Sequence, residues 1–193
     1  METLEQEIIE KRIVFVRQKY SSLETGMYVN GEILKFREIN LFDEHINLLI
    51  PESFIEMPIR FQVIRYPSIY RPKVILTSLD MNVNLGLTLF EKKADKEELT
   101  ETINSVKNVI KRGYPDYRFF EMKKELAKNN PYCWFDFRSY ALDDSVYNIY
   151  FVVLADNKIL QGNFNCLYRD AEEWKKTALQ MIENIKWIKG EQE

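Results

Sequence analysis

Two stretches of the chain repeat apolar residues at helical spacings of three and four. The first consists of Leu99, Ile103, Val106 and Ile110, and the second of Trp174, Ala178, Met181, Ile185 and Ile188. Asp95 and Glu98 have the spacing of a capping box, and Gly113 stands where a helix would end. We therefore predict amphipathic helices over 96–111 and 170–188, with Asp170 as the N-cap of the second.

Apolar and polar residues alternate through much of the remaining chain, which is typical of strands. The predicted strands cover 36–41, 46–50, 74–77, 82–90, 117–126, 132–141, 146–154 and 159–167. The last four follow one another through short turns, which favours an antiparallel meander. Asn30-Gly31 between apolar flanks predicts a hairpin over 28–33, because both turn residues tolerate positive φ.

Three segments give weaker patterns. Ile9, Ile13, Val16 and Tyr20 fall on one helical face and favour a helix over 2–20. The β-branched and aromatic run 13–16 could instead begin a strand. Pro51 is expected to open a short helical turn over 51–57, and 58–66 is expected to form another short helix.

The order of these elements predicts an α+β fold, a largely antiparallel β-sheet sandwiched by helices in an α/β/α arrangement. The chain has 193 residues, with only 6 glycines and 6 prolines. This length suits one folded domain with a sizeable core, and the composition excludes a disordered or collagen-like chain. We expect an N-terminal extension over 1–30 and a single domain over 31–193.

The charge pattern narrows the classes of partner. The formal net charge is −3 and the sequence pI is about 5.5, which disfavours nucleic acid and anionic membranes as partners. No apolar run approaches the roughly 20 residues of a transmembrane helix. The acidic start, with Glu2, Glu5, Glu7 and Glu10, lacks the pattern of a secretory signal. We expect a cytoplasmic protein that does not bind membranes.

Residues for the common catalytic and metal sites are missing or isolated. The glycines are scattered, so no phosphate loop is present, and no Gly-x-Ser-x-Gly motif occurs. His45 is the only histidine, and we interpret it as a turn residue rather than a general base. The meander places Cys133 and Cys166 two strand spacings apart, too far for a disulfide, so both are predicted to be free and buried. No catalytic residue, cofactor or metal is expected.

Two further groups of side chains have alternative interpretations. The carboxylates of Asp136, Asp143, Asp144 and Asp156 could bind a hard cation, but most of them lie at predicted turns, where aspartate is common. The strand aromatics could form an exposed binding platform, but the two predicted helices need such a surface to pack on. This second group is Trp134, Phe135, Phe137, Tyr140, Tyr147, Tyr150 and Phe151. We expect the aspartates to serve turns and the aromatic residues to belong to the core.

The segment 60–73 is the best candidate for a binding site. Its candidate residues are Arg60, Arg65, Tyr66, Tyr70, Arg71 and Lys73. Protein interfaces favour arginine and tyrosine, and arginine binds carboxylates and phosphates with two hydrogen bonds. In the alternative interpretation Phe61, Ile64 and the tyrosines anchor the loop to the sheet, while the charged groups face water.

Three short stretches carry a family resemblance. They are 49–54 with Met57-Pro58, 66–73, and 161–166 followed by Trp174. Over about residues 33–190 the chain resembles bacterial members of the MOG/PsbP-like superfamily. The resemblance implies an α/β/α sandwich around an antiparallel sheet. Its characterised relatives are mainly non-enzymatic, a Ran-binding factor and extrinsic photosystem II subunits. Their partner-binding residues find no match here, so none is transferred.

The missing catalytic groups and this resemblance favour a non-enzymatic, cytoplasmic protein-interaction module with a protein partner. The alternative is a small anionic-ligand-binding protein or an enzyme, with a cleft near Arg65, Tyr70 and Arg71. The N-terminal segment could pack on its own domain, on a partner or on a second copy, so a homo-oligomer is a further expectation.

Overall fold

The computed structural model describes residues 4–141 and 144–188. Its helices are α1 (Leu4–Lys19), α2 (Ile59–Arg65), α3 (Lys96–Gly113) and α4 (Ala171–Glu183), the last preceded by the 3-10 turn η1 (Tyr168–Asp170). The first strands are β1 (Ser21–Ser22), β2 (Gly26–Val29), β3 (Glu32–Leu34), β4 (Phe36–Leu41), β5 (Ile46–Pro51), β6 (Ile55–Glu56) and β7 (Val74–Thr77). The others are β8 (Asn84–Lys93), β9 (Arg118–Glu125), β10 (Tyr132–Tyr140), β11 (Ser145–Ala155), β12 (Lys158–Leu167) and β13 (Lys186–Trp187).

The main sheet has seven strands in the order β6-β7-β8-β12-β11-β10-β9, with all neighbours antiparallel. Strands β9 to β12 form the predicted meander. Its last strand, β12, pairs with β8, which precedes the meander in the chain. Two smaller sheets, β1-β2-β3 and β13-β5-β4, lie beside the main sheet. The predicted α+β fold with a largely antiparallel sheet is therefore confirmed.

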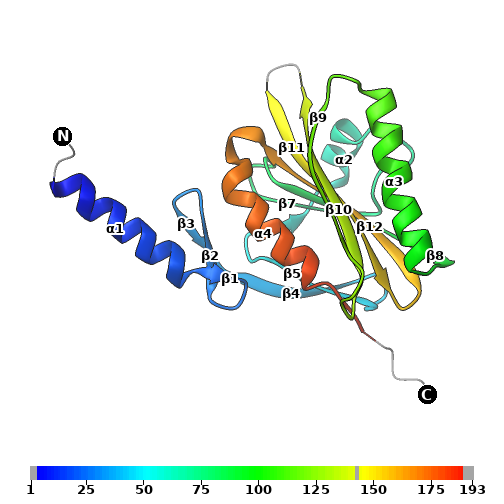
Figure 1. Ribbon diagram of the computed structural model, residues 1–193, viewed down its shortest axis with the longest axis horizontal. Coiled ribbons are helices and arrows are strands. Elements are labelled where there is room, and N and C mark those ends of the chain that lie inside the picture. Colours follow the sequence, from blue (N-terminus) through cyan, green and yellow to red (C-terminus); the bar gives the residue numbers. More distant parts are fainter. Residues whose placement is uncertain (1–3, 142–143, 189–193) are drawn as a thin grey trace.

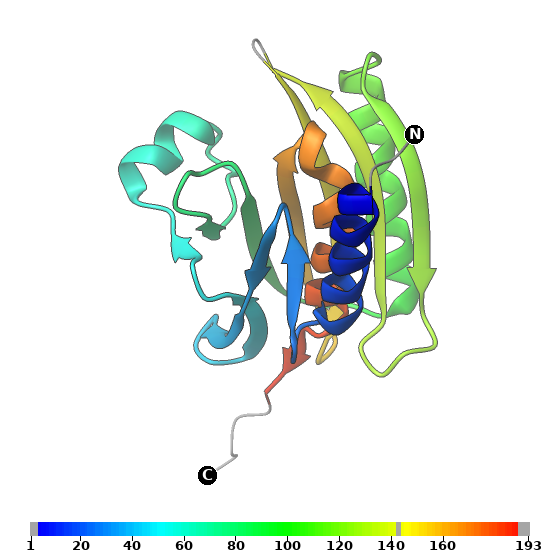
Figure 2. The same cartoon turned by 90° about the vertical axis from the view of Figure 1, so that its left-hand side faces the viewer.

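Helices cover both faces of the main sheet (Figures 1 and 2). Helix α3 covers one face, where Leu99 and Ile103 pack against Cys133, Phe135 and other side chains of β10 and β11. Its capping box forms as predicted, with Asp95 accepting from the backbone of residues 97 and 98. The alternation along β10 sends Trp134 to the opposite face, where α4 lies. The two apolar layers therefore use alternate residues of the same strands.

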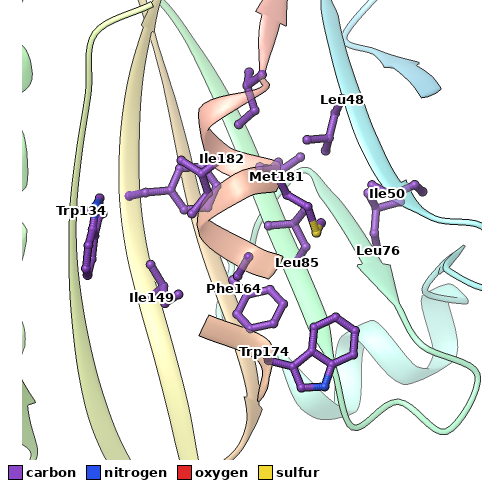
Figure 3. Close-up of a cluster of buried hydrophobic side chains, with 14 of the residues drawn as sticks. Leu48, Ile50, Leu76, Leu85, Trp134, Ile149, Phe164, Trp174, Met181 and Ile182 are labelled. Carbon is purple, nitrogen blue, oxygen red and sulfur yellow. The ribbon is translucent and has the colours of Figure 1, made fainter. Parts of the chain in front are cut away.

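The larger core lies between the sheet and α4 (Figure 3). Trp174, Met181 and Ile182 of α4 point into it, and Phe164 of β12 packs against Trp174 with ring centroids 5.8 Å apart. Strand β5 closes this layer from the far side of α4, with Leu48 and Ile50 buried. Most of the strand aromatics are buried, as predicted; Tyr140 is the exception, with 49% of its surface exposed.

The prediction of a helical turn over 51–57 is wrong. Residues 55–56 form the short strand β6, which pairs with β7. The helix predicted over 170–188 ends at Glu183, because Lys186 and Trp187 pair with β5 as β13. Asp170 ends the 3-10 turn η1, and its side chain makes no capping hydrogen bond. The errors at 51–57 and 184–188 come from pairing with strands distant in sequence, which local patterns do not encode.

The N-terminal segment forms the predicted helix, α1. It projects away from the rest of the molecule, with its start as the most distant point (Figure 1). The hairpin β2-β3 also forms as predicted, with Asn30 and Gly31 at φ values of 49° and 87°. The predicted domain boundary at residue 30 falls in this turn and stays a prediction.

Candidate functional site

Helix α2 carries the first part of the predicted binding segment. Its inner side is fixed by Gln62, a buried residue whose Nε2 donates to the Met57 carbonyl over 2.7 Å. Arg65 donates from Nη1 to the carbonyl of Met81, in the β7–β8 turn. The guanidinium of Arg60 lies 4.7 Å from the ring centroid of Phe61. Gln62 and Arg65 thus hold α2 to the segment that precedes it and to the β7–β8 turn, while Ile59, Val63 and Ile64 are exposed.

The loop after α2 lies close over β8. Pro72 packs directly on Gly86, where a Cβ atom would come within 2.6 Å of the proline ring. Only glycine allows this approach. The Lys73 amide donates to Oγ1 of Thr88 over 3.3 Å. The loop is therefore held at its C-terminal end by packing and by a hydrogen bond, although it has no regular structure of its own.

A row of polar side chains holds the other end of the loop. Thr77, Asn84 and Asn165 are cross-strand neighbours on β7, β8 and β12. Thr77 Oγ1 donates to Asn84 Oδ1 over 2.7 Å, Asn84 Nδ2 donates to Asn165 Oδ1 over 3.0 Å, and Asn165 Nδ2 donates to the Tyr66 hydroxyl over 3.5 Å. Burial raises the pKa of Tyr66, against smaller opposite effects of Asn165 and Arg65. Tyr66 is therefore an anchor of the loop.

Several apolar side chains of this region are exposed. We call them the α2 surface, which consists of Ile59, Val63 and Ile64 of α2 with Ile69 and Tyr70 of the loop. The exposed fractions are 74% for Ile64, 87% for Ile69 and 89% for Tyr70. Ile64 and Tyr70 were predicted to anchor the loop if it served only packing, and they do not. Tyr66, which is half-buried and bonded to Asn165, has that role, and Phe61 is half-buried.

The charged residues of the segment lie between and beside these apolar residues along the chain. Arg60, Arg65 and Lys73 are exposed and Arg71 is half-buried. Arg65 is engaged with the backbone of Met81. Of the six predicted site residues, Arg60, Arg65 and Tyr66 make side-chain contacts within the chain. Lys73 is held by its backbone amide, Arg71 is half-buried, and Tyr70 stands in solvent. Sequence reasoning missed Ile59, Val63 and Ile69, although their apolar side chains beside arginines were the available signal.

A second polar cluster is buried under α4. The Asp136 carboxylate accepts from the Glu121 amide at 2.6 Å, the Tyr147 hydroxyl at 2.7 Å and the Lys175 ammonium at 2.7 Å. Phe120 and Glu121 form a bulge in β9 opposite Asp136. The carboxylate therefore satisfies an amide that the bulge removes from the ladder.

The electrostatics of this cluster point to a structural role. Burial, and then the neighbouring carboxylate of Asp136, raise the pKa of Tyr147 well above its usual value. Desolvation lowers the pKa of Lys175, but its hydrogen bonds to Asp136 and Glu121 outweigh this, so the net shift is upward. Asp136 is 1% exposed and Tyr147 is 3% exposed, so solvent and substrates do not reach them. The cluster fastens α4 to the sheet.

Two open cavities lie away from the α2 surface. One, of about 470 Å³, lies between the β2-β3 hairpin, the β7–β8 turn and the start of α4. Its carboxylate Asp80 is held by Ser78 and Asn82; burial alone would raise the pKa of Asp80, but these hydrogen bonds lower it. The other, of about 460 Å³, lies between α3 and strands β8 and β12. In the first of these cavities, the carboxylate of Asp80 stabilises the β7–β8 turn and is not aimed at a ligand.

The histidine, the two cysteines and Asp144 are isolated candidates in the sequence, but in the structure each is packed against or paired with other side chains. His45 stacks on Trp187 with centroids 4.9 Å apart. Cys133 and Cys166 are free and buried, as predicted, on opposite faces of the sheet. Asp144 lies 3.7 Å from Arg169 as an ion pair, and Asp143 lies outside the described residues. Within the described ranges, His, Cys, Asp and Glu form no group suited to a metal ion.

By sequence, the chain matches no protein-family model and no curated protein. Its fold is similar to that of solved structures. The cyanobacterial PsbP (CyanoP) of Synechocystis sp. PCC 6803 superposes with a TM-score of 0.59 at 9% identity, over 82% of this chain and 96% of that one.

Two further structures agree. LpqN of Mycobacterium tuberculosis, described as involved in cell envelope biogenesis, gives a TM-score of 0.53 at 12% identity, over 86% of this chain and 97% of that one. A protein of Bacteroides thetaiotaomicron gives 0.52 at 8% identity, over 81% of this chain and 50% of that one. At these identities the likeness concerns the fold alone. It confirms the fold that the short sequence motifs implied: the chain has a PsbP-like fold.

Proposed function

We propose that this chain is a non-enzymatic binding module that recognises a protein partner through the α2 surface. The observation that carries the proposal is the exposure of Ile64, Ile69 and Tyr70, each more than 70% accessible, on one segment. Large apolar side chains gathered on a surface are typical of interaction sites. Tyrosine and arginine, both present here, dominate the energetics of protein interfaces.

The anchoring of the segment supports the same proposal. Pro72 against Gly86 and Tyr66 against Asn165 fix the loop from below. A surface that is already ordered loses less conformational entropy when it binds. The apolar side chains are therefore presented by a preorganised support.

The charges define the chemistry of the partner. Arg60, Arg71 and Lys73 flank the apolar side chains with positive charge. A complementary partner presents aliphatic side chains bordered by carboxylates. A cleft for a small anion near Arg65, Tyr70 and Arg71 receives less support, because Tyr70 is almost fully exposed and Arg65 is engaged with Met81.

The cytoplasm is the compartment we propose for this interaction. Two free, buried cysteines are compatible with a reducing environment. Across the described residues, no helix has the length and apolar character needed to cross a membrane.

Site-specific photocrosslinking tests the proposal. A photoreactive amino acid replaces Ile64 in the full chain, and a control places it at Val109, which is 68% exposed on α3. We expect one discrete adduct from position 64 in cells of the source organism, and none from position 109. The captured protein is then purified and titrated against the chain.

The titration decides the result. Ile64→Glu is expected to weaken binding at least tenfold, since a carboxylate replaces a desolvated anchor. The matched variant Val109→Glu should bind like the wild type, and both should keep the wild-type melting temperature. Equal binding by Ile64→Glu and the wild type, or equal adducts at both positions, would refute the α2 surface as the binding site.

A further inference from the structure

Helix α1 has apolar side chains on two sides. Ile9, Ile13, Val16 and Tyr20 form the side that leads to the β-hairpin, where Tyr20 accepts from the amide of Tyr28. Leu4, Ile8 and Phe15 form a second stripe, because spacings of four and seven return to the same face of a helix. Leu4 is 75% exposed and Phe15 is 65% exposed. The described residues leave this second stripe exposed.

The surface of the second stripe has the shape that another helix fits. A shallow apolar depression there is lined by Ile8, Lys11, Arg12, Phe15 and Val16. The first four stand at positions i, i+3, i+4 and i+7, the four residues that form a hole for a side chain of a facing helix. The long stems of Lys11 and Arg12 form its walls.

The charges along α1 specify the direction of that facing helix. Residues 4–10 contain Glu5, Glu7 and Glu10 and no basic residue, while residues 11–19 contain Lys11, Arg12, Arg17 and Lys19 and no acidic residue. A parallel second copy would oppose like charges. An antiparallel copy places the acidic half of each helix against the basic half of the other, twice, by the symmetry of a two-fold contact.

The positions of the charges beside the stripe agree with this arrangement. Glu5 and Arg12 border one side of it, and Glu7 and Lys11 border the other. In an antiparallel pair the same sides meet, so Glu5 faces Arg12 and Glu7 faces Lys11 of the second copy. Glu7 and Lys11 already form an exposed ion pair within one helix, 2.7 Å long, which costs little to exchange.

We propose that the chain forms a homodimer through antiparallel pairing of α1 with α1 of a second copy. Ile8 of each helix enters the hole 8/11/12/15 of the other, which brings Leu4 onto the other copy's Phe15. The pairing closes on itself, so it yields a dimer and not a filament. A single helix pair buries less than the roughly 1,000 Å² typical of stable interfaces, so the dimer depends on protein concentration.

Charge exchange tests the pairing on the full chain. Sedimentation equilibrium at about 1 to 200 µM protein measures self-association, which follows mass action. We expect the wild type to dimerise, and both Glu5→Lys/Glu7→Lys and Lys11→Glu/Arg12→Glu to weaken dimerisation at least tenfold. An equimolar mixture of the two double variants should form a heterodimer, because each supplies the charge that the other lacks.

A matched control keeps the test specific. Glu10 lies about 140° around the helix from the stripe, so Glu10→Lys should dimerise like the wild type. Ile64→Glu on α2 should also leave the dimer unchanged, which separates this proposal from the proposed function. A monomeric wild type at the highest concentration, unaffected double variants, or a mixture that stays monomeric would each overturn the antiparallel pairing.

Discussion

Helices α1 and α4 have similar composition and opposite surroundings. Both have two glutamates in the first turn and both carry several large apolar residues. Helix α4 buries five residues of its 13 against the sheet, while none of the 16 described residues of α1 is buried. Apolar content therefore does not decide burial. What decides it is whether the apolar residues share one face and whether the fold supplies a surface opposite that face.

The largest expected effect on stability comes from removing the Trp174 ring of α4 from the core. Trp174→Ala removes a buried ring that contacts Phe54 and Phe164, and we expect it to lower the free energy of unfolding by about 3–5 kcal/mol. Phe15→Ala on α1 should change it by less than about 0.5 kcal/mol in dilute protein. Urea denaturation measures both. Comparable losses would mean that α1 is part of the core.

A smaller effect on stability is expected from weakening the polar contacts between α4 and the sheet. Asp136→Asn keeps the shape of the side chain but removes the charge that holds Lys175 and Tyr147. We expect a loss of about 2 kcal/mol, below the usual cost of breaking a buried pair because Lys175 can turn toward water. Glu10→Gln on α1, at an exposed position away from the second stripe, is the control and should have no measurable effect.

The pH dependence of stability tests the same polar cluster beneath α4. The pKa values of Lys175 and Tyr147 are raised in the folded protein, so the folded state holds both protons more tightly than the unfolded chain. Their contribution to stability is complete below the unfolded values of 10.5 and 10.0, and it is lost as the pH rises above them. Urea midpoints should fall with rising alkaline pH in the wild type, and less steeply in Lys175→Gln.

The smallest effect is expected where the two helices meet. Arg17 of α1 pairs with Glu173 of α4, and its guanidinium also lies 5.9 Å from the ring centroid of Tyr28. Arg17→Ala should change the free energy of unfolding by less than about 1 kcal/mol, as partly exposed ion pairs contribute little. Amide hydrogen exchange in α1 should nevertheless become faster, while exchange in α4 stays the same. Unchanged exchange in α1 would show that this pair does not restrain it.

Much of the fold follows from local pattern. The meander β9–β12 was predicted because alternation and turn residues agree along its whole length, and α3 because its stripe, capping box and closing glycine agree. The end of α4 was not predicted correctly. Ile185 and Ile188 continue the helical spacing, but residues 186–187 pair with β5 as a strand. Local spacing records which residues are apolar, and distant segments determine how they pair.

The candidate site shows the same limit. The segment 60–73 was recognisable from its arginines and tyrosines, but the sequence does not distinguish Tyr66, held by Asn165, from Tyr70, which stands in solvent. Tyr66 is held by a contact with β12, and the loop passes close over Gly86 of β8, so both contacts involve segments distant in sequence. The alternation of polar and apolar residues in 161–166 does predict a polar face, and Asn165 of the anchoring row lies on it.

The bulge in β9 also limits how the molecule can assemble. An open sheet invites further strands at its edges, which leads to aggregation. One edge here is β6, only two residues long. The other is β9, which is interrupted by the bulge at 120–121 and carries the exposed lysines 123 and 124. Neither edge of the main sheet offers a long, flat template, so addition of a strand from a second copy to this sheet is disfavoured.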